Sequence, residues 1–249
     1  MTKRKVEKIA LIISIALLIL LLTSFAGYKL SKARTYQIFG GITSRVNTTE
    51  KVVALTFDDG PTSQTNAVLD ILKAKNTKAT IYVAGKDLAN QPESGKAIAM
   101  SGHELGNHSY YHNTMIFKTP SSVNSELSET NRLIRETGYT GNITFRPPYG
   151  KKLILLPWIL KQNNMKTIMW DIEPDTYHSG NTSDIVSHTV NNVKPGSIII
   201  MHPFCESRCQ ADREAIPLII DNLKANGYKF VTISDLLKTQ KMQANSSNK

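Results

Sequence analysis

The segment Thr56-Phe57-Asp58-Asp59-Gly60-Pro61 places two adjacent aspartates at the end of an apolar run, and the rest of the chain can be interpreted around it. Residues 52–57 predict a buried strand, which Gly60-Pro61 terminates. Because the chain turns at the end of a strand, both carboxylates can face one pocket, where their like charges would repel each other. We therefore expect a cation to lie beside them.

A pair of histidines follows about fifty residues later, in His108-Ser109-Tyr110-Tyr111-His112. Two imidazoles and one carboxylate are the ligand set of a hydrolytic zinc site that keeps an open position for water. The sequence therefore predicts a divalent-metal site made by Asp59, His108 and His112.

Strand-like and helix-like segments alternate through the rest of the chain. The strands are predicted at 51–57, 78–83, 103–107, 143–146, 166–170, 197–201 and 228–232. Helical patterns lie between them, for example at 66–74, 121–137 and 213–226. Alternation of this kind is typical of parallel strands joined by right-handed crossovers. The predicted fold class is α/β, as a distorted (β/α) barrel with about seven parallel strands.

Polar side chains fall at the carboxyl ends of the predicted strands, where parallel α/β proteins bind their ligands. They are Asp58 and Asp59 on the first strand, His108 on the third, Arg146 on the fourth, Asp171 on the fifth and His202 on the sixth. We expect these side chains to meet at one mouth.

The N-terminal region predicts a membrane helix. Residues 9–28 are apolar and uncharged, and about 20 such residues span a bilayer core of roughly 30 Å. We expect a cytoplasmic basic segment (1–8), a single-pass signal-anchor (9–28), a stalk (29–49), an extracytoplasmic domain (50–240) and a polar tail (241–249). The competing interpretation is a signal peptide cleaved after Ala26, which would give a secreted protein.

Net charge gives no support for nucleic-acid binding. The chain carries +10, but residues 1–34 hold seven basic residues and one acid, or +6, which leaves +4 for the remainder. The two cysteines, Cys205 and Cys209, could form a disulfide in an exported protein or remain two thiols.

Four of these motifs together resemble the NodB-homology domain of the polysaccharide deacetylases, carbohydrate esterase family 4, and in particular its peptidoglycan N-acetylglucosamine deacetylases. The resemblance covers about residues 50–240. The motifs are Thr56-Phe57-Asp58-Asp59-Gly60-Pro61, His108-Ser109-Tyr110-Tyr111-His112, Arg146-Pro147-Pro148-Tyr149-Gly150 and Ile200-Met201-His202.

The resemblance implies roles for individual residues. Asp59, His108 and His112 would bind the metal, most often Zn²⁺, with Co²⁺ or Mn²⁺ as alternatives. Asp58 would be the general base and His202 the general acid. Arg146 would orient Asp58, and the backbone N–H of Tyr149 would help to hold the oxyanion. The residues expected to contact the sugar are Tyr149, Pro148, Trp170 and Tyr177.

One motif departs from the family pattern. Where family members commonly carry Asp-x-x-Asp-Trp, this chain has Trp170-Asp171-Ile172-Glu173-Pro174-Asp175-Thr176-Tyr177. Alignment on Trp170 places Glu173 at the first aspartate and Tyr177 at the tryptophan. Glu173 and Asp171 are therefore alternative candidates for the carboxylate that supports His202.

The function expected from these observations is metal-dependent removal of N-acetyl groups from N-acetylglucosamine in a cell-wall polysaccharide, above all peptidoglycan. The alternatives are an O-acetyl esterase acting on a xylan-like polysaccharide, a deacetylase of chitin or chito-oligosaccharides, and a non-catalytic carbohydrate-binding relative. We expect a monomer whose partners are its acetylated glycan and the membrane.

Overall fold

A computed structural model describes residues 3–246 and, in the last helix, side chains as far as residue 240. Its strands are β1 (Ile42–Thr43), β2 (Val52–Gly60), β3 (Thr80–Val83), β4 (Glu104–Asn107), β5 (Thr167–Ile168), β6 (Ile198–Met201) and β7 (Lys229–Phe230). The main sheet has the order β4-β3-β2-β6, with β7 also pairing with β2, while β1 pairs with β5. Each of these pairings is parallel. The parallel α/β class predicted from the sequence is confirmed.

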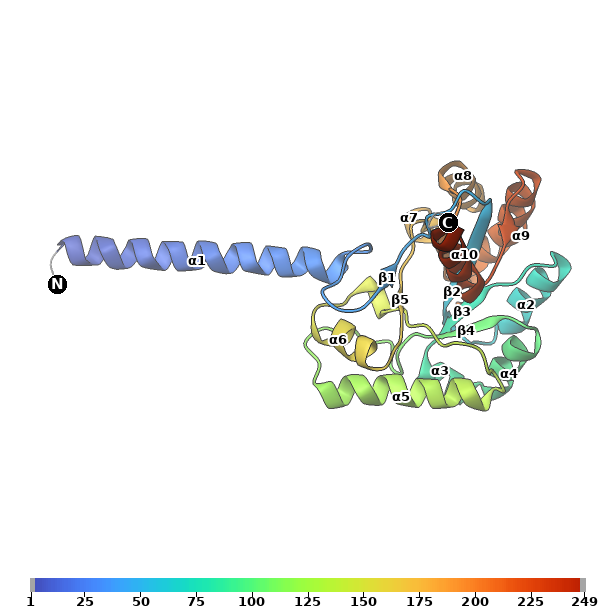
Figure 1. Cartoon of the computed structure of the whole chain (residues 1–249), viewed down its shortest axis with the longest axis horizontal. Helices are drawn as coiled ribbons and strands as arrows, with labels where there is room; N and C mark the ends of the chain where they lie inside the picture. Colours follow the sequence, from blue (N-terminus) through green and yellow to red (C-terminus); the bar gives the residue numbers. More distant parts are fainter. Residues whose placement is uncertain (1–2, 247–249) are drawn as a thin grey trace.

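The helices pack around the strands, except for α1, which extends away from them (Figure 1). They are α1 (Lys3–Lys32), α2 (Thr65–Ala74), α3 (Gly85–Asn90), α4 (Pro92–Met100), α5 (Pro120–Glu136), α6 (Leu155–Gln162), α7 (Pro174–Tyr177), α8 (Thr182–Asn192), α9 (Gln210–Ala225) and α10 (Ile233–Ser246). Two short 3₁₀ turns lie at Pro148–Gly150 and Ser207–Cys209. The three predicted helices correspond to α2, α5 and α9, within a few residues at each end.

The alternation of side chains along β2 positions the site. Val53, Leu55 and Phe57 are buried in one hydrophobic cluster, whereas Val52 and Ala54 belong to a second cluster on the other face. Because successive residues of a strand point to opposite faces, Thr56 and Asp58 continue the second face. The side chain of Asp58 therefore lies on the same face of the sheet as those of Val52 and Ala54.

The predicted strand at 143–146 is not a strand. Only Phe145 pairs, through isolated bridges to Asn107 and Thr167, because Pro147 and Pro148 follow at once and proline has no N–H to donate. Another bridge joins Ile172 to Ile199 of β6. The pairing thus passes from β4 through Phe145 to β5, and from Ile172 back to β6.

Much of the segment 29–49, predicted from the sequence to be a stalk, packs on the domain. β1 pairs with β5, Val46 is fully buried, and its N–H donates to Gly196 O. The polar tail predicted at 241–249 is helical as far as Ser246, and 247–249 lie outside the described residues.

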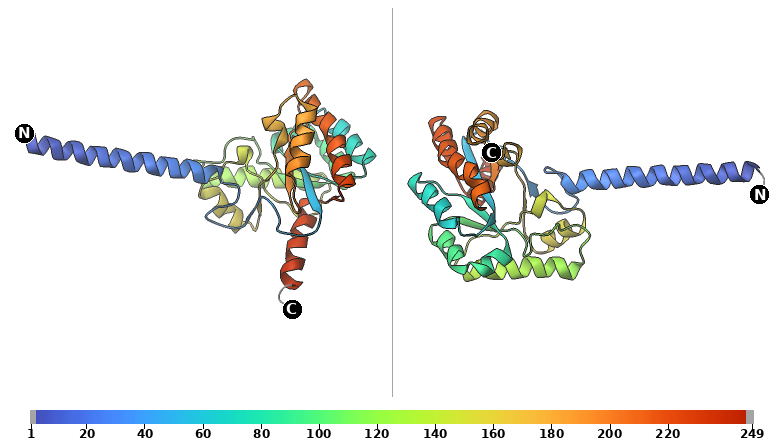
Figure 2. Two further views of the ribbon diagram at one scale, coloured as in Figure 1. Left: turned by 90° about the horizontal axis from the view of Figure 1, so that it is seen from above. Right: turned by 180° about the vertical axis from the view of Figure 1, so that it is seen from behind.

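Helix α1 extends away from the rest of the chain, and only its C-terminal end reaches the domain (Figure 2). Its length and apolar composition are sufficient to cross a membrane. The predicted span, 9–28, lies wholly within it.

Candidate active site

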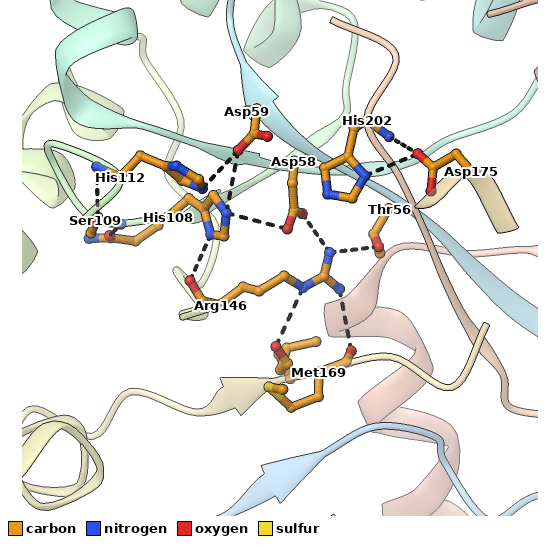
Figure 3. Close-up of polar contacts among 12 residues, drawn as sticks. Thr56, Asp58, Asp59, His108, Ser109, His112, Arg146, Met169, Asp175 and His202 are labelled. Carbon is orange, nitrogen blue, oxygen red and sulfur yellow. Dashed lines mark hydrogen bonds and ion pairs between the residues drawn. The ribbon is translucent and has the colours of Figure 1, made fainter. Parts of the chain in front are cut away.

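The end of β2 brings two adjacent carboxylates to one place. Asp58 is buried, and Asp59 has a φ of 66°, in the left-handed region. The register between β2 and β3 shifts between Asp58 and Gly60, as at a β-bulge, which re-aims a side chain. The side chain of Asp59 therefore turns toward the same space as that of Asp58 (Figure 3).

Arg146 is fully buried and lies beneath Asp58. Its Nη1 donates to Asp58 Oδ1 at 2.6 Å and to Thr56 Oγ1 at 2.9 Å. The guanidinium also lies over the ring of Tyr82, 4.1 Å from its centroid. A buried charge is stable only when it is paired and hydrogen-bonded, so this arrangement fixes Asp58 in position and offsets its charge.

His108 presents one ring nitrogen to the carboxylates. Its Nδ1 lies 2.7 Å from the carbonyl oxygen of Arg146, to which it donates. Burial lowers the pKa of His108, outweighing the pull of Asp58 and Asp59 in the other direction. In the neutral imidazole, Nε2 is then an acceptor, and it faces Asp58 Oδ2 at 3.4 Å and Asp59 Oδ1 at 3.6 Å. Three acceptors facing one another call for a cation.

His112 completes a potential metal site. Its Nε2 lies 3.1 Å from Asp59 Oδ1, and the ligand atoms of Asp59, His108 and His112 lie within 4.8 Å of one another. Burial acts to lower the pKa of His112, but the Asp59 carboxylate outweighs it and raises this pKa. Although His112 Nε2 lies 3.1 Å away, Asp59 Oδ1 is buried and accepts no well-formed hydrogen bond from the described residues. This donor set and its orphaned oxygen fit a divalent cation.

Two residues that the sequence interpretation missed hold the segment 108–112, called here the histidine loop. Glu126 Oε2 accepts from the N–H groups of Tyr110 and Tyr111, at 2.9 and 3.1 Å, and Asn107 Oδ1 accepts from Ser109 N at 2.8 Å. Glu126 is buried although it lies on the otherwise amphipathic α5. An acid on the apolar face of a helix was the signal that could have identified it.

His202 lies across the cavity from the histidine loop and pairs with Asp175. Asp175 Oδ2 is 3.0 Å from His202 Nδ1 and also accepts the backbone N–H of His202. Burial acts to lower the pKa of His202, but Asp175, helped by Asp58 and Asp59, raises it to about 9. His202 is therefore protonated at neutral pH.

The two carboxylates predicted to support His202 do not contact it. Asp171 accepts from Ser197 Oγ and from the N–H of Ile198, both at 2.8 Å. Glu173 pairs with Arg34 and accepts from Trp170 Nε1 at 2.8 Å. Pro174 starts a short helix that turns Asp175 back toward His202. The missed signal was a second aspartate, Asp175, four residues after Asp171. A gapless alignment on Trp170 does not place Asp175 at an aspartate of the family motif.

The four predicted sugar contacts divide into two pairs. Tyr149 and Trp170 line the cavity, whereas Pro148 and Tyr177 are not among its lining residues. Tyr149 has a φ of 58° and an exposed ring 4.8 Å from that of His112. Trp170 is mostly buried in the core.

A cavity of about 580 Å³ joins these groups. The residues that line it include Asp58, Asp59, His108, His112, Asp175 and His202. Cys209 also lies on the wall and forms a disulfide with Cys205, which resolves the alternative left open by the sequence.

This combination of a parallel α/β fold with paired aspartates, three imidazoles and a buried arginine defines a hydrolytic enzyme. The family model described as polysaccharide deacetylase matches residues 45–168. A peptidoglycan-N-acetylglucosamine deacetylase of Bacillus cereus is 34% identical over 192 residues, which cover 76% of this chain and 69% of that protein. The chain therefore belongs to the polysaccharide deacetylase family.

Solved structures show the same likeness. The crystal structure of a peptidoglycan N-acetylglucosamine deacetylase aligns with a TM-score of 0.73 at 30% identity, covering 78% of this chain and 91% of that one. A pseudoenzyme of carbohydrate esterase family 4 from Bacillus anthracis aligns with a TM-score of 0.72 at 28% identity, covering 81% of this chain and 70% of that one.

Proposed function

We propose that this deacetylase removes the N-acetyl group from N-acetylglucosamine residues of peptidoglycan in a metal-dependent reaction. The observation that carries the proposal is the convergence of three groups on one cavity: the Asp58–Arg146 pair, the cluster of Asp59, His108 and His112, and the His202–Asp175 pair. Similarity to proteins named as peptidoglycan deacetylases supports the choice of substrate. The bridges at Phe145 and Ile172 support a distorted barrel as the full description of the fold.

Asp59, His108 and His112 would hold the metal, which we propose is Zn²⁺. A bound divalent cation acidifies water and withdraws electron density from a carbonyl oxygen. The hydrogen bond from His108 Nδ1 to Arg146 O fixes the tautomer that leaves Nε2 free for this role.

Asp58 and His202 would move the protons. Asp58, held by Arg146, accepts a proton from the attacking water as general base. His202, protonated because of Asp175, donates a proton to the departing amine, so that the sugar leaves as a neutral amine rather than an anion. The backbone N–H of Tyr149, at the cavity wall, is proposed to donate to the developing oxyanion.

We further propose that α1 anchors the enzyme in a membrane, with the catalytic domain outside the cytoplasm. The support is a 30-residue helix that has an apolar central stretch, residues 9–28, and whose only buried residue is Ser31. An exported domain also suits the Cys205–Cys209 disulfide, because disulfides persist in oxidising compartments.

The test uses the purified full chain, stripped of metal and then supplied with Zn²⁺. Acetate release is followed from peptidoglycan, from chito-oligosaccharides and from acetylated xylan, beside Asp59→Ala and the exposed control Arg132→Gln. Zinc should restore release from peptidoglycan in the native chain and in the control, but not in Asp59→Ala. Release from acetylated xylan alone would replace the N-deacetylase proposal with an O-acetyl esterase.

A further inference from the structure

The C-terminal end of α1 is fastened to the catalytic domain by a buried lysine. The carbonyl oxygen of Ser31 accepts the backbone N–H of Lys152 at 2.9 Å, and that of Ala33 accepts from Lys152 Nζ. Lys152 is only 1% exposed, and burial lowers its pKa to about 8. The last carbonyls of a helix carry a partial negative charge that a cation stabilises. The end of α1 is therefore bound to the domain through Lys152.

Arg34 directly follows the segment that contacts Lys152, and it is held against the wall of the active site. Its guanidinium lies over the ring of Trp170, 4.7 Å from the centroid, and pairs with Glu173. Glu173 is in turn fixed by Trp170 Nε1 at 2.8 Å. The Arg34 side chain remains 36% exposed. Stacking and ion pairing together preorganise the cation.

The segment Ser31–Arg34 contributes to the catalytic cavity itself. Lys32 and Arg34 line it together with Arg208. Three of the lining carboxylates have cationic partners: Asp58 with Arg146, Glu173 with Arg34, and Asp175 with protonated His202. Lys32 donates to a neutral group, the phenol oxygen of Tyr28. Lys32 therefore adds a positive charge that no ion pair among the described residues neutralises, on a wall that Asp59 and Asp212 also line.

We propose that Ser31–Arg34 is part of the substrate site and that Arg34 binds a carboxylate on the sugar next to the one that is deacetylated. The guanidinium has five N–H donors, and Glu173 engages one terminal nitrogen, Nη2, so other donors remain for a second carboxylate. The inference rests on the proposed function, because the cavity is taken as a glycan site. The ligand chemistry is that of a glycan with a free carboxylate on alternate sugars, as in muramic acid whose carboxyl group is not amide-linked to a peptide.

The experiment measures binding of the full chain, in detergent micelles, to a soluble N-acetylated glycan that carries free carboxylates. The same glycan with its carboxylates methyl-esterified is the matched ligand. Affinities are measured calorimetrically for the native chain, Arg34→Gln, Arg34→Lys and the control Arg132→Gln. Arg132 is exposed on α5 and pairs only within that helix.

The native chain and the control should bind the free-carboxylate glycan about tenfold more tightly than its ester, as the loss of one charge-assisted hydrogen bond implies. Arg34→Gln should abolish this preference, and Arg34→Lys should keep part of it because the charge remains. In turnover, Arg34→Gln should raise KM for the free-carboxylate glycan and leave kcat unchanged.

Retention of the preference in Arg34→Gln, or equal weakening toward both ligands, would overturn the role of Arg34. Because binding is measured without turnover, the result separates this role from the proposed function. A preference that depends on Arg34, with no acetate released by the native chain, would refute the deacetylation and keep the inference.

Discussion

The His202–Asp175 pair leads to a prediction about the pH dependence of the reaction. Asp175 is the carboxylate that raises the pKa of His202 to about 9, with Asp58 and Asp59 adding to its effect. In Asp175→Asn the amide can still hydrogen-bond to the imidazole, but the negative charge is gone. Burial then acts on His202 with less opposition, so its pKa should fall toward or below its ordinary value of about 6.5.

The size of the effect follows from the fraction of His202 that is protonated. A group raised to a pKa of about 9 is almost fully protonated at about pH 7.5, whereas a group with a pKa near 6.5 is about one-tenth protonated. A general acid acts only in its protonated form. We therefore expect kcat/KM at this pH to fall about tenfold.

The assay is acetate release between about pH 5 and 10 by the metal-loaded chain. Native activity should fall as pH rises through the pKa of His202, which lies at or below about 9 because the bound cation lowers it. This fall is the alkaline limb of the pH–activity profile, and Asp175→Asn should move it to lower pH. Asp171→Asn is the matched control, since Asp171 contacts Ser197 and Ile198 instead of His202, and it should leave the limb in place. An unmoved limb in Asp175→Asn, or an equal displacement in both variants, refutes the pairing.

Three further predictions concern stability and metal binding. Arg146→Met leaves Asp58 buried without its cation, so urea unfolding should show a loss of about 3–5 kcal/mol, and a loss below about 1 kcal/mol would contradict the pairing. Glu126→Ala frees the loop that carries His112, and zinc titration should show an affinity about 10-fold lower or more, whereas unchanged affinity argues against this support. Zn²⁺ at about 100 times its Kd should stabilise the native chain by about 2.7 kcal/mol and raise its Tm, while Asp59→Ala should show no rise.

The sequence was sufficient to predict the site residues that are polar or charged at positions where an apolar, buried residue would be usual. Asp58 and His202 directly follow apolar runs, and such polar residues are costly there unless they serve a site. Arg146 before two prolines was recognisable for the same reason. The structure brings these side chains together as expected.

The parts that were missed depend on turns and on distant contacts. Asp175 reaches His202 only because Pro174 starts a helical turn, which a spacing rule does not capture. The segment 29–49 is polar and aperiodic, yet it docks through β1 and Val46, and a two-residue strand leaves no periodic signal. The role of Lys152 required knowing that α1 ends beside it.

The central claim, catalysis at Asp58, is tested most directly by Asp58→Asn in the metal-loaded full chain. Acetate release and glycan affinity are measured on the same peptidoglycan fragments. We expect the variant to bind the glycan about as well as the native chain and to release acetate at least about 100-fold more slowly. Equal release by the two proteins would contradict the claim, and so would glycan binding without acetate release by the native chain.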